Sequence, residues 1–386
     1  MKKPNYLLNL FLGGLVKIFT FFKGQRIIQK CQIKGPAIVL SNHTSFYDFL
    51  YTHAALYTRA VTYLAAKKMF YEKSTGFFLR LARAIPKNLM QADPIATMNA
   101  FKILKKNGVI SIFPEGQISP SGRSLKPSFS IAKLLKKAKV NVYIVKHFGA
   151  GLVNPPWTKK TFKGRIETIK ELIISKEELS QLSLDDIYKI VYDKLYYSPS
   201  IDQQSKKYQY RLNDISNLEN VIYQCPKCLH EGLISNKHQL ICPACDNHLT
   251  YDSYGFLEGL GLDEWFYKQE ERVRKEIDSN QDYSLSGTTK VMSFRNQLLV
   301  FVGQGVITLK NGEYLFEGYI DNEFKSLSFK ASSIPSLPSD IGRNIQIYEG
   351  DQIYQFEMDV KWLPTKMVHM GEYLYELHHN QESFQI

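Results

Sequence analysis

The chain has 386 residues, more than one ordinary domain of about 100–200 residues requires. Hydrophobic residues make up 44% of it and charged residues 22%, which is typical of a folded globular protein and excludes a disordered tail, a fibrous repeat and a polytopic membrane protein. The net charge of +12 favours anionic partners such as nucleic acid, acidic lipid headgroups or phosphorylated substrates. Five cysteines are too few for a disulfide scaffold.

The longest apolar stretch, residues 7–22, predicts a helix of roughly 24 Å, shorter than the roughly 30 Å core of a bilayer. It has no Ala-x-Ala site, which argues against a removed signal peptide. Polar and small residues occupy about a third of its circumference: Asn5, Asn9, Gly13, Lys17, Thr20 and Lys23. We interpret residues 1–24 as an amphipathic helix in the membrane interface with its lysines toward the headgroups. The alternative is a helix packed on its own domain.

Residues 31–172 alternate between strand-like and helix-like segments. Apolar runs typical of strands cover 34–42, 61–66, 109–113 and 140–145. Helical patterns cover 48–57, 69–80, 93–107 and 128–139; the third begins at Asp93-Pro94 and stops before Gly108. This alternation predicts an α/β layer structure.

The second half of the chain changes character. Residues 176–222 look helical and polar, and 263–279 predict a charged helix. Short β segments follow between 288 and 358, with a closing helix over 362–379, a pattern typical of a small β-barrel or sandwich, of which a pleckstrin-homology-like domain is one form. We expect a domain over 25–200, a helical linker over 201–222, a cysteine-bearing module over 223–250, a helical connector over 251–287 and a β-rich accessory domain over 288–386.

Two segments, SNHTSFYD and FPEG, carry candidate chemistry. His43 stands at a predicted strand end and Asp48 at a helix start. A histidine in such a place can take a proton from a hydroxyl, and a carboxylate one helical turn on can bind its other ring nitrogen and stabilise the imidazolium. Alone, such a pair is more often an ordinary loop hydrogen bond.

His-x4-Asp, followed about 65 residues later by Phe-Pro-Glu-Gly at a strand end, resembles the glycerolipid acyltransferase family over residues 30–175. The residues matching its first and third motifs are Asn42, His43, Ser45, Asp48, Phe113, Pro114, Glu115 and Gly116. The resemblance implies a mixed sheet flanked by helices, with His43 as general base and Asp48 as its orienting partner. The other six motif residues, Asn42, Ser45, Phe113, Pro114, Glu115 and Gly116, are expected to bind substrate, with Glu115 and Gly116 lining the acceptor site. It also implies direct attack of the acceptor hydroxyl on an acyl thioester, of coenzyme A or acyl-carrier protein, with no cofactor required for catalysis.

Departures from the family pattern concern the acceptor. The third motif usually continues Thr-Arg-Ser, where this chain has Gln117-Ile118-Ser119, and both prolines of the fourth motif are absent from 140–145. A lysine such as Lys87 meets a phosphate only as a point charge, whereas an arginine can bind it with two hydrogen bonds. The candidate phosphate contacts are Arg83, Lys87 and Arg123, and each has the alternative of being a solvated charge.

Two Cys-Pro-x-Cys knuckles lie thirteen residues apart. Their cysteines are Cys225, Cys228, Cys242 and Cys245. This spacing predicts a four-cysteine zinc ribbon, and because four thiolates fill the tetrahedron the metal should be structural. The ribbon has no basic run interleaved with aromatic residues, which disfavours nucleic acid as a partner.

The sequence therefore predicts a peripheral or monotopic O-acyltransferase on the cytoplasmic face of an anionic membrane, acting on a lysophospholipid or related lipid. The alternative is an inactive lipid-docking scaffold that recruits partners through the zinc ribbon and the β domain.

Overall fold

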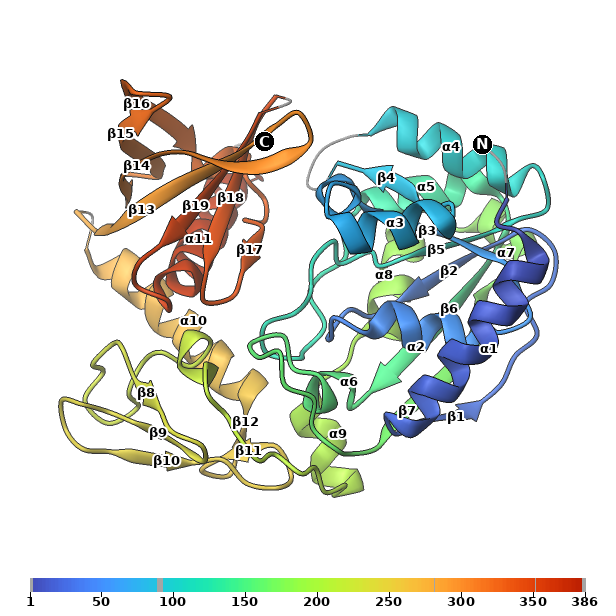
Figure 1. Ribbon diagram of the computed structural model, residues 1–386, viewed down its shortest axis with the longest axis horizontal. Helices are drawn as coiled ribbons and strands as arrows, with labels where there is room; N and C mark the ends of the chain where they lie inside the picture. The colour runs from blue at the N-terminus through green and yellow to red at the C-terminus, as the bar shows by residue number, and fades with distance from the viewer. Residues whose placement is uncertain (1–2, 89–92, 281, 351, 384–386) are drawn as a thin grey trace. The chain divides into compact units, whose positions relative to one another are not determined.

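The computed structural model describes residues 3–88, 93–280, 282–350 and 352–383 (Figure 1). The first two residues of the predicted N-terminal helix (1–2) and the last three of the predicted β domain (384–386) lie outside the described ranges. The chain forms two compact units. Unit 1 comprises 1–213 with 252–256, and unit 2 comprises 214–251 with 257–386.

Unit 1 is built on a seven-stranded sheet. Its strands are β1 (Gln25–Gln29), β2 (Ala37–Ser41), β3 (Val61–Ala66), β4 (Ile85–Lys87), β5 (Val109–Ile112), β6 (Asn141–Phe148) and β7 (Ile166–Ile174). The spatial order is β1-β7-β6-β2-β5-β3-β4, and all neighbours are parallel except β6 and β7. The predicted mixed α/β sheet is confirmed.

The helices of unit 1 come before, between and after these strands. They are α1 (Tyr6–Phe22), α2 (Asp48–Ala55), η1 (Lys67–Phe70), α3 (Lys73–Leu81), α4 (Pro94–Leu104), α5 (Ser130–Ala138), α6 (Ala150–Val153), α7 (Lys176–Gln181), α8 (Leu184–Leu195) and α9 (Pro199–Lys206). Asp93 caps α4 by accepting a hydrogen bond from the amide of Ala96, as the Asp-Pro start predicted.

Helices cover both faces of the central strands. Ile38 and Leu40 of β2 pack with buried residues of α4, α5 and α8, whereas Ala37 and Val39 pack on the other face with residues at the end of α2. Successive side chains of a strand point to opposite faces. Burial on both faces therefore explains why β2 is a continuous apolar run in the sequence.

Three strands of unit 1 lie outside the predicted segments. β1 and β4 are the end strands of the sheet, and β4 is only three residues long with a proline at its centre. A proline cannot donate to a strand ladder, so it is tolerated at an edge. β7 mixes polar with apolar residues along its length, unlike the buried parallel strands.

Helix α1 packs on unit 1 through its polar and small side, which corrects the orientation expected from the sequence. Asn9, Gly13 and Thr20 are buried, and the Asn9 side-chain amide donates to the carbonyl oxygen of Arg59 at 3.3 Å. A Cβ at Gly13 would lie 3.2 Å from both His53 and Tyr57, so glycine permits the close approach to α2. Half of the polar stripe expected to face headgroups thus faces the protein, whereas Asn5 and Lys17 are exposed.

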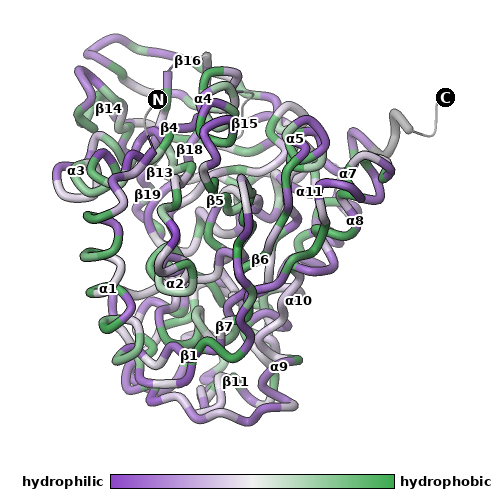
Figure 2. Tube along the Cα trace, turned by 90° about the vertical axis from the view of Figure 1, so that its right-hand side faces the viewer, coloured by the Kyte–Doolittle hydropathy of each residue, from purple (hydrophilic) through white to green (hydrophobic). Residues whose placement is uncertain are grey.

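The apolar side of α1 is left exposed, and in Figure 2 most of the helix is coloured as hydrophobic. Its exposed large residues are Tyr6, Leu7, Phe11, Leu15, Ile18, Phe19, Phe21 and Phe22. Within the described residues, no helix is both long enough and apolar enough to cross a membrane.

The segment predicted as a helical linker over 201–222 is helical only at its two ends. α9 stops at Lys206, and η2 (Leu218–Asn220) is a single short turn. Between them the chain is irregular, and it buries Tyr210 and Ile215.

Unit 2 contains the cysteine-bearing module and an antiparallel β domain. The module carries β8 (Ile234–Ser235), β9 (Gln239–Ile241) and β10 (His248–Thr250), and β11 (Phe256–Leu257) and β12 (Leu260–Gly261) lead toward α10 (Leu262–Ser279). The β domain has β13 (Ser284–Arg295), β14 (Leu298–Lys310), β15 (Glu313–Ile320), β16 (Glu323–Lys330), η3 (Ala331–Ser333), β17 (Ser339–Asp340), β18 (Asn344–Glu349), β19 (Gln352–Met358) and α11 (Leu363–Ser383).

The β domain is an all-antiparallel seven-stranded sheet in the order β16-β15-β14-β13-β19-β18-β17. Its core joins strand residues such as Phe316 and Phe356 to Val273 of α10 and Met367 of α11. The sequence pattern predicted several strands followed by one helix, and the structure has both. The pairing of β13 with β19 joins the strands before η3 to those after it in one sheet.

Candidate active site

The two motifs meet at one edge of the unit 1 sheet. β2 and β5 are adjacent and parallel, with Leu40 opposite Ile112. His43 follows β2 and Phe113 follows β5, so both lie beyond the carboxyl ends of their strands. In open α/β sheets this edge is where ligands bind.

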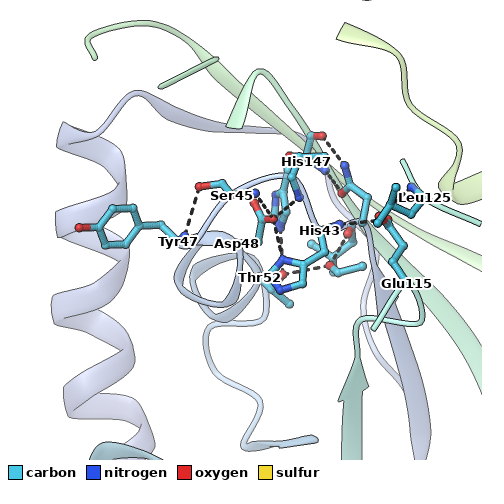
Figure 3. Close-up of polar contacts among 12 residues, drawn as sticks. His43, Ser45, Tyr47, Asp48, Thr52, Glu115, Leu125 and His147 are labelled. Carbon is cyan, nitrogen blue, oxygen red and sulfur yellow. Dashed lines mark hydrogen bonds and ion pairs between the residues drawn. The ribbon is translucent and has the colours of Figure 1, made fainter. Parts of the chain in front are cut away.

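His43 and Asp48 form a hydrogen-bonded pair (Figure 3). The His43 Nδ1 atom lies 3.1 Å from the Asp48 Oδ2 atom, and the same oxygen accepts the backbone amides of Thr44 at 2.6 Å and Ser45 at 2.7 Å. Asp48 is the first residue of α2, where the partial positive charge of a helix N-terminus favours a carboxylate. The loop before the helix therefore wraps around one carboxylate oxygen.

The pair is asymmetric in its access to solvent. The Asp48 side chain is fully buried, whereas 19% of the His43 side chain is exposed. With Nδ1 donating to Asp48, the lone pair of the imidazole is on Nε2. Nε2 has no hydrogen-bond partner within the described part of the chain, so it is the atom that can accept a proton from an incoming hydroxyl.

Phe113 and Glu115 hold His43 from the side of β5. The Phe113 ring stacks on the imidazole with a centroid distance of 4.4 Å and an interplanar angle of 27°. The buried Glu115 carboxylate accepts the backbone amide of His43 at 3.1 Å and that of Leu125 at 2.9 Å. Glu115 thus ties the loop after β2 to the loop after β5.

Burial raises the pKa of Glu115 to about 8. The two backbone hydrogen bonds oppose this shift, and the nearby Asp48 charge adds to it. Gly116, which follows, has a φ of +78°, a backbone conformation that residues with a Cβ rarely adopt. The Pro114 carbonyl accepts the amide of Ser128 at 3.1 Å. The FPEG segment is therefore a fixed turn.

Asn42 and Ser45, which were expected to bind substrate, are both buried and bonded within the protein. The Asn42 side chain donates to the carbonyl of His147 at 2.9 Å and accepts its amide at 2.8 Å. The Ser45 hydroxyl accepts the amide of Tyr47 at 3.2 Å. In this structure both side chains shape the loop that carries His43.

The three basic candidates lie in different places. Lys87 ends β4 at the same edge of the sheet as His43; its amine donates to the Asn88 carbonyl at 3.1 Å, and burial lowers its pKa. Arg83 precedes β4, toward the other edge, and its guanidinium donates to the carbonyl of Lys3. Arg123 lies on the loop after Gly116. The next residue of this loop, Ser124, donates its backbone amide to the carbonyl of Tyr197 at 2.9 Å.

One residue beside the pair was not predicted. His147 lies near the end of β6, and its fully buried imidazole is 2.9 Å from the Thr52 hydroxyl. The signal was present, because a polar residue follows the apolar run 140–145 as His43 follows 37–41. The predicted strand stopped at residue 145, two residues before His147.

The four cysteines of unit 2 come together as predicted, and their sulfur atoms all lie within 4.8 Å of one another. The Cys225 and Cys245 sulfurs are 3.7 Å apart, and those of Cys228 and Cys242 are 3.6 Å apart. Sulfurs bound to zinc at about 2.3 Å in a tetrahedron are about 3.8 Å apart. The cluster can therefore hold a metal ion, and its spacing fits a tetrahedral thiolate site.

Comparison with known proteins agrees with these observations. Residues 20–146 match the family model described as Acyltransferase. The 1-acyl-sn-glycerol-3-phosphate acyltransferase of Bacillus subtilis (strain 168) is 25% identical over 109 residues, which are 28% of this chain and 55% of that protein. The chain thus spans about half the length of this curated relative.

A solved structure is also similar: the 1-acyl-sn-glycerophosphate (LPA) acyltransferase PlsC from Thermotoga maritima, with a TM-score of 0.40 and 18% identity, covering 48% of this chain and 78% of that one. The motif-based resemblance to the glycerolipid acyltransferase family is confirmed over residues 20–146, the part of the chain that the family model matches.

The clamp made by Glu115 yields a stability prediction. Glu115→Gln should lower the free energy of unfolding by about 1–3 kcal/mol, because its NH2 group cannot accept one of the two amides. A glutamate whose folded pKa is raised keeps its proton after the unfolded chain has lost it. Wild-type stability should therefore fall as pH rises from about 4.5 toward 8.

Urea unfolding at pH 5 and pH 8 measures both effects. The Glu115 contribution to the pH slope should be absent from Glu115→Gln and retained in Glu177→Gln, an exposed control on α7. Equal slopes in wild type and Glu115→Gln would contradict the prediction.

Proposed function

We propose that the protein is a membrane-surface O-acyltransferase that transfers a fatty acyl group from a thioester, acyl-CoA or acyl-carrier protein, to the hydroxyl of a lysophospholipid. The observation that carries the proposal is the His43–Asp48 pair at the carboxyl edge of an acyltransferase-family sheet.

His43 acts through Nε2. It takes the proton of the acceptor hydroxyl as the oxygen attacks the thioester carbonyl, and Asp48 stabilises the imidazolium that forms. The tetrahedral intermediate then collapses with loss of the thiolate, which takes the proton from His43. One ester bond forms, one thioester bond breaks, and the base returns to its starting state.

Lys87 is a candidate contact for the acceptor phosphate, because it lies at the same edge of the sheet. Arg123 is a second, since it follows the FPEG turn by seven residues. Arg83 is a weaker candidate in this proposal because its guanidinium already binds the Lys3 carbonyl. Glu115 supports the site through the backbone of His43.

Substitution of the base tests this function. His43→Ala should lower the rate of ester formation by about 10²–10⁴-fold, the contribution of a positioned general base. The assay incubates the full chain with labelled acyl thioester, a lysolipid panel and vesicles. His238→Ala, which removes an exposed imidazole of unit 2, is the matched control and should keep wild-type activity.

If wild type transfers no acyl group to any acceptor but still binds vesicles, the inactive scaffold is the correct reading. If His43→Ala retains wild-type turnover, the catalytic assignment is wrong.

The exposed side of α1 supports attachment to a bilayer. The Phe19 ring of α1 lies 6.5 Å from that of Tyr47, and Phe46 and Phe49, on either side of the start of α2, are 55% and 47% exposed. A helix with one apolar side exposed can lie in the interface, and the net charge of +12 favours anionic lipid. An acceptor dissolved in that lipid would be close to the proposed base.

A charge placed on this surface should weaken vesicle binding. Phe11→Glu inserts a carboxylate into the exposed side of α1, where Phe11 is 67% exposed. The fraction that sediments with anionic vesicles should fall at least severalfold, whereas the fold should be retained because the buried side of α1 is unchanged. Phe324→Glu, at a 63% exposed phenylalanine of unit 2, is the control. Unchanged sedimentation of Phe11→Glu would exclude α1 as the attachment site.

We further propose that the cysteine cluster holds a structural zinc ion. Four thiolates leave no open coordination position, and the residues before Cys225 are fixed to the rest of unit 2: the Tyr223 and Gln224 amides donate to the Gln269 side chain of α10. The Tyr223 ring also stacks on Trp362 at 5.3 Å. Loss of the metal would release this attachment.

The metal is tested by composition and by melting. Wild type should contain about one zinc ion per chain. Cys228→Ser should lose the metal and lower the melting temperature of unit 2, because ribbon folding depends on binding. Cys31→Ser, outside the cluster, should change neither. A metal-free wild type with the same melting temperature would refute the site.

A further inference from the structure

Hydrogen bonds among buried side chains run beside the His43–Asp48 pair, and His147 is at their centre (Figure 3). Its Nε2 atom lies 2.9 Å from the Thr52 hydroxyl of α2, and its Nδ1 atom lies 3.0 Å from the Thr168 hydroxyl of β7. The imidazole is fully buried. Both ring nitrogens are thus occupied within the protein.

The direction of each bond follows from groups that can only accept or only donate. The Ser41 hydroxyl contacts the Val145 carbonyl, which cannot donate, so the single Ser41 proton lies there. The Thr52 hydroxyl, 2.9 Å from Ser41, must then donate to Ser41. Thr52 has no second proton, so it accepts from His147 Nε2–H.

The other side of the ring gives the same answer. The Gln25 amide nitrogen donates to the carbonyl of Tyr51 and to the Thr168 hydroxyl, both at 2.9 Å. Thr168 therefore keeps its own proton to donate to His147 Nδ1. His147 is the neutral Nε2–H tautomer, and burial, which lowers its pKa to about 4, keeps it neutral.

His147 is attached to both segments that carry the pair. Its main chain exchanges two hydrogen bonds with Asn42, the residue before His43. Its side chain binds Thr52, one helical turn after Asp48 on α2. One residue of β6 thus sets the end of β2 and the start of α2 relative to each other.

We propose that His147 is a positioning residue for acyl transfer: its main chain and its Nε2–H fix Asn42 and Thr52, and thereby hold Asp48 in place against His43. This inference rests on the proposed function, because it assigns a consequence for turnover.

Two valine substitutions test it as a matched pair. Thr52 and Thr168 are both buried threonines, and each hydroxyl makes one bond to His147 and one to a further side chain. Thr52→Val should lower kcat about tenfold or more with KM for the thioester unchanged, because α2 loses its hydrogen bond to His147. Thr168→Val should keep kcat within about twofold, since the Nε2–H bond to Thr52 remains. Thr52→Ser restores the hydroxyl and should restore kcat.

Nitrogen NMR of histidine-labelled protein gives a second measurement that needs no activity. His147 should show a protonated Nε2 and an unprotonated Nδ1 at neutral pH. The ring signals of His43 should shift in Thr52→Val and stay at wild-type positions in Thr168→Val.

The outcomes separate the two proposals. Equal loss of kcat in both valine variants, in step with lost stability, or an Nδ1–H tautomer of His147, overturns the positioning role. Wild-type turnover in His43→Ala overturns the catalytic assignment instead, and the NMR shifts then report the coupling of Thr52 to His43 alone.

Discussion

One carboxylate oxygen organises the site. Asp48 Oδ2 accepts from the His43 ring and from two consecutive backbone amides, and it can do so because α2 begins at that residue. The other oxygen, Oδ1, is buried without a hydrogen-bond partner among the described residues. Three donors converging on one atom determine the path of the loop, and the loop determines where the imidazole faces. Hydrogen bonds to an ionised acceptor are the stronger kind, so the arrangement resists distortion.

The second carboxyl group of the site has different surroundings. Glu115 spreads its two oxygens over two amides from separate loops, and its pKa is raised mainly by burial and further by the nearby Asp48 charge. Burial without a compensating positive charge favours its neutral form. Glu115 bridges two main-chain segments, whereas Asp48 is placed to balance a positive imidazole.

The sequence predicted these parts unequally, for physical reasons. The buried strands β2 and β5 and the helix start at Asp93 were predictable because burial on two faces and capping chemistry leave local signatures. β1 and β4 were missed because an edge strand needs neither a continuous apolar run nor a full ladder. The His43–Asp48 pair was predicted from its spacing together with the Phe-Pro-Glu-Gly motif and the family resemblance. The contact of Thr52 with His147 spans more than ninety residues and depends on strand order, which no local pattern encodes.

The burial of the polar side of α1 has a consequence for how the protein behaves away from lipid. Because the contact with the domain is made through Asn9, Gly13 and Thr20, folding leaves much of the Leu and Phe surface of α1 exposed. In buffer without lipid or detergent, that surface can be covered only by a second copy of the chain. Concentration-dependent self-association in the absence of vesicles is therefore the expected behaviour, and amphiphiles should reverse it.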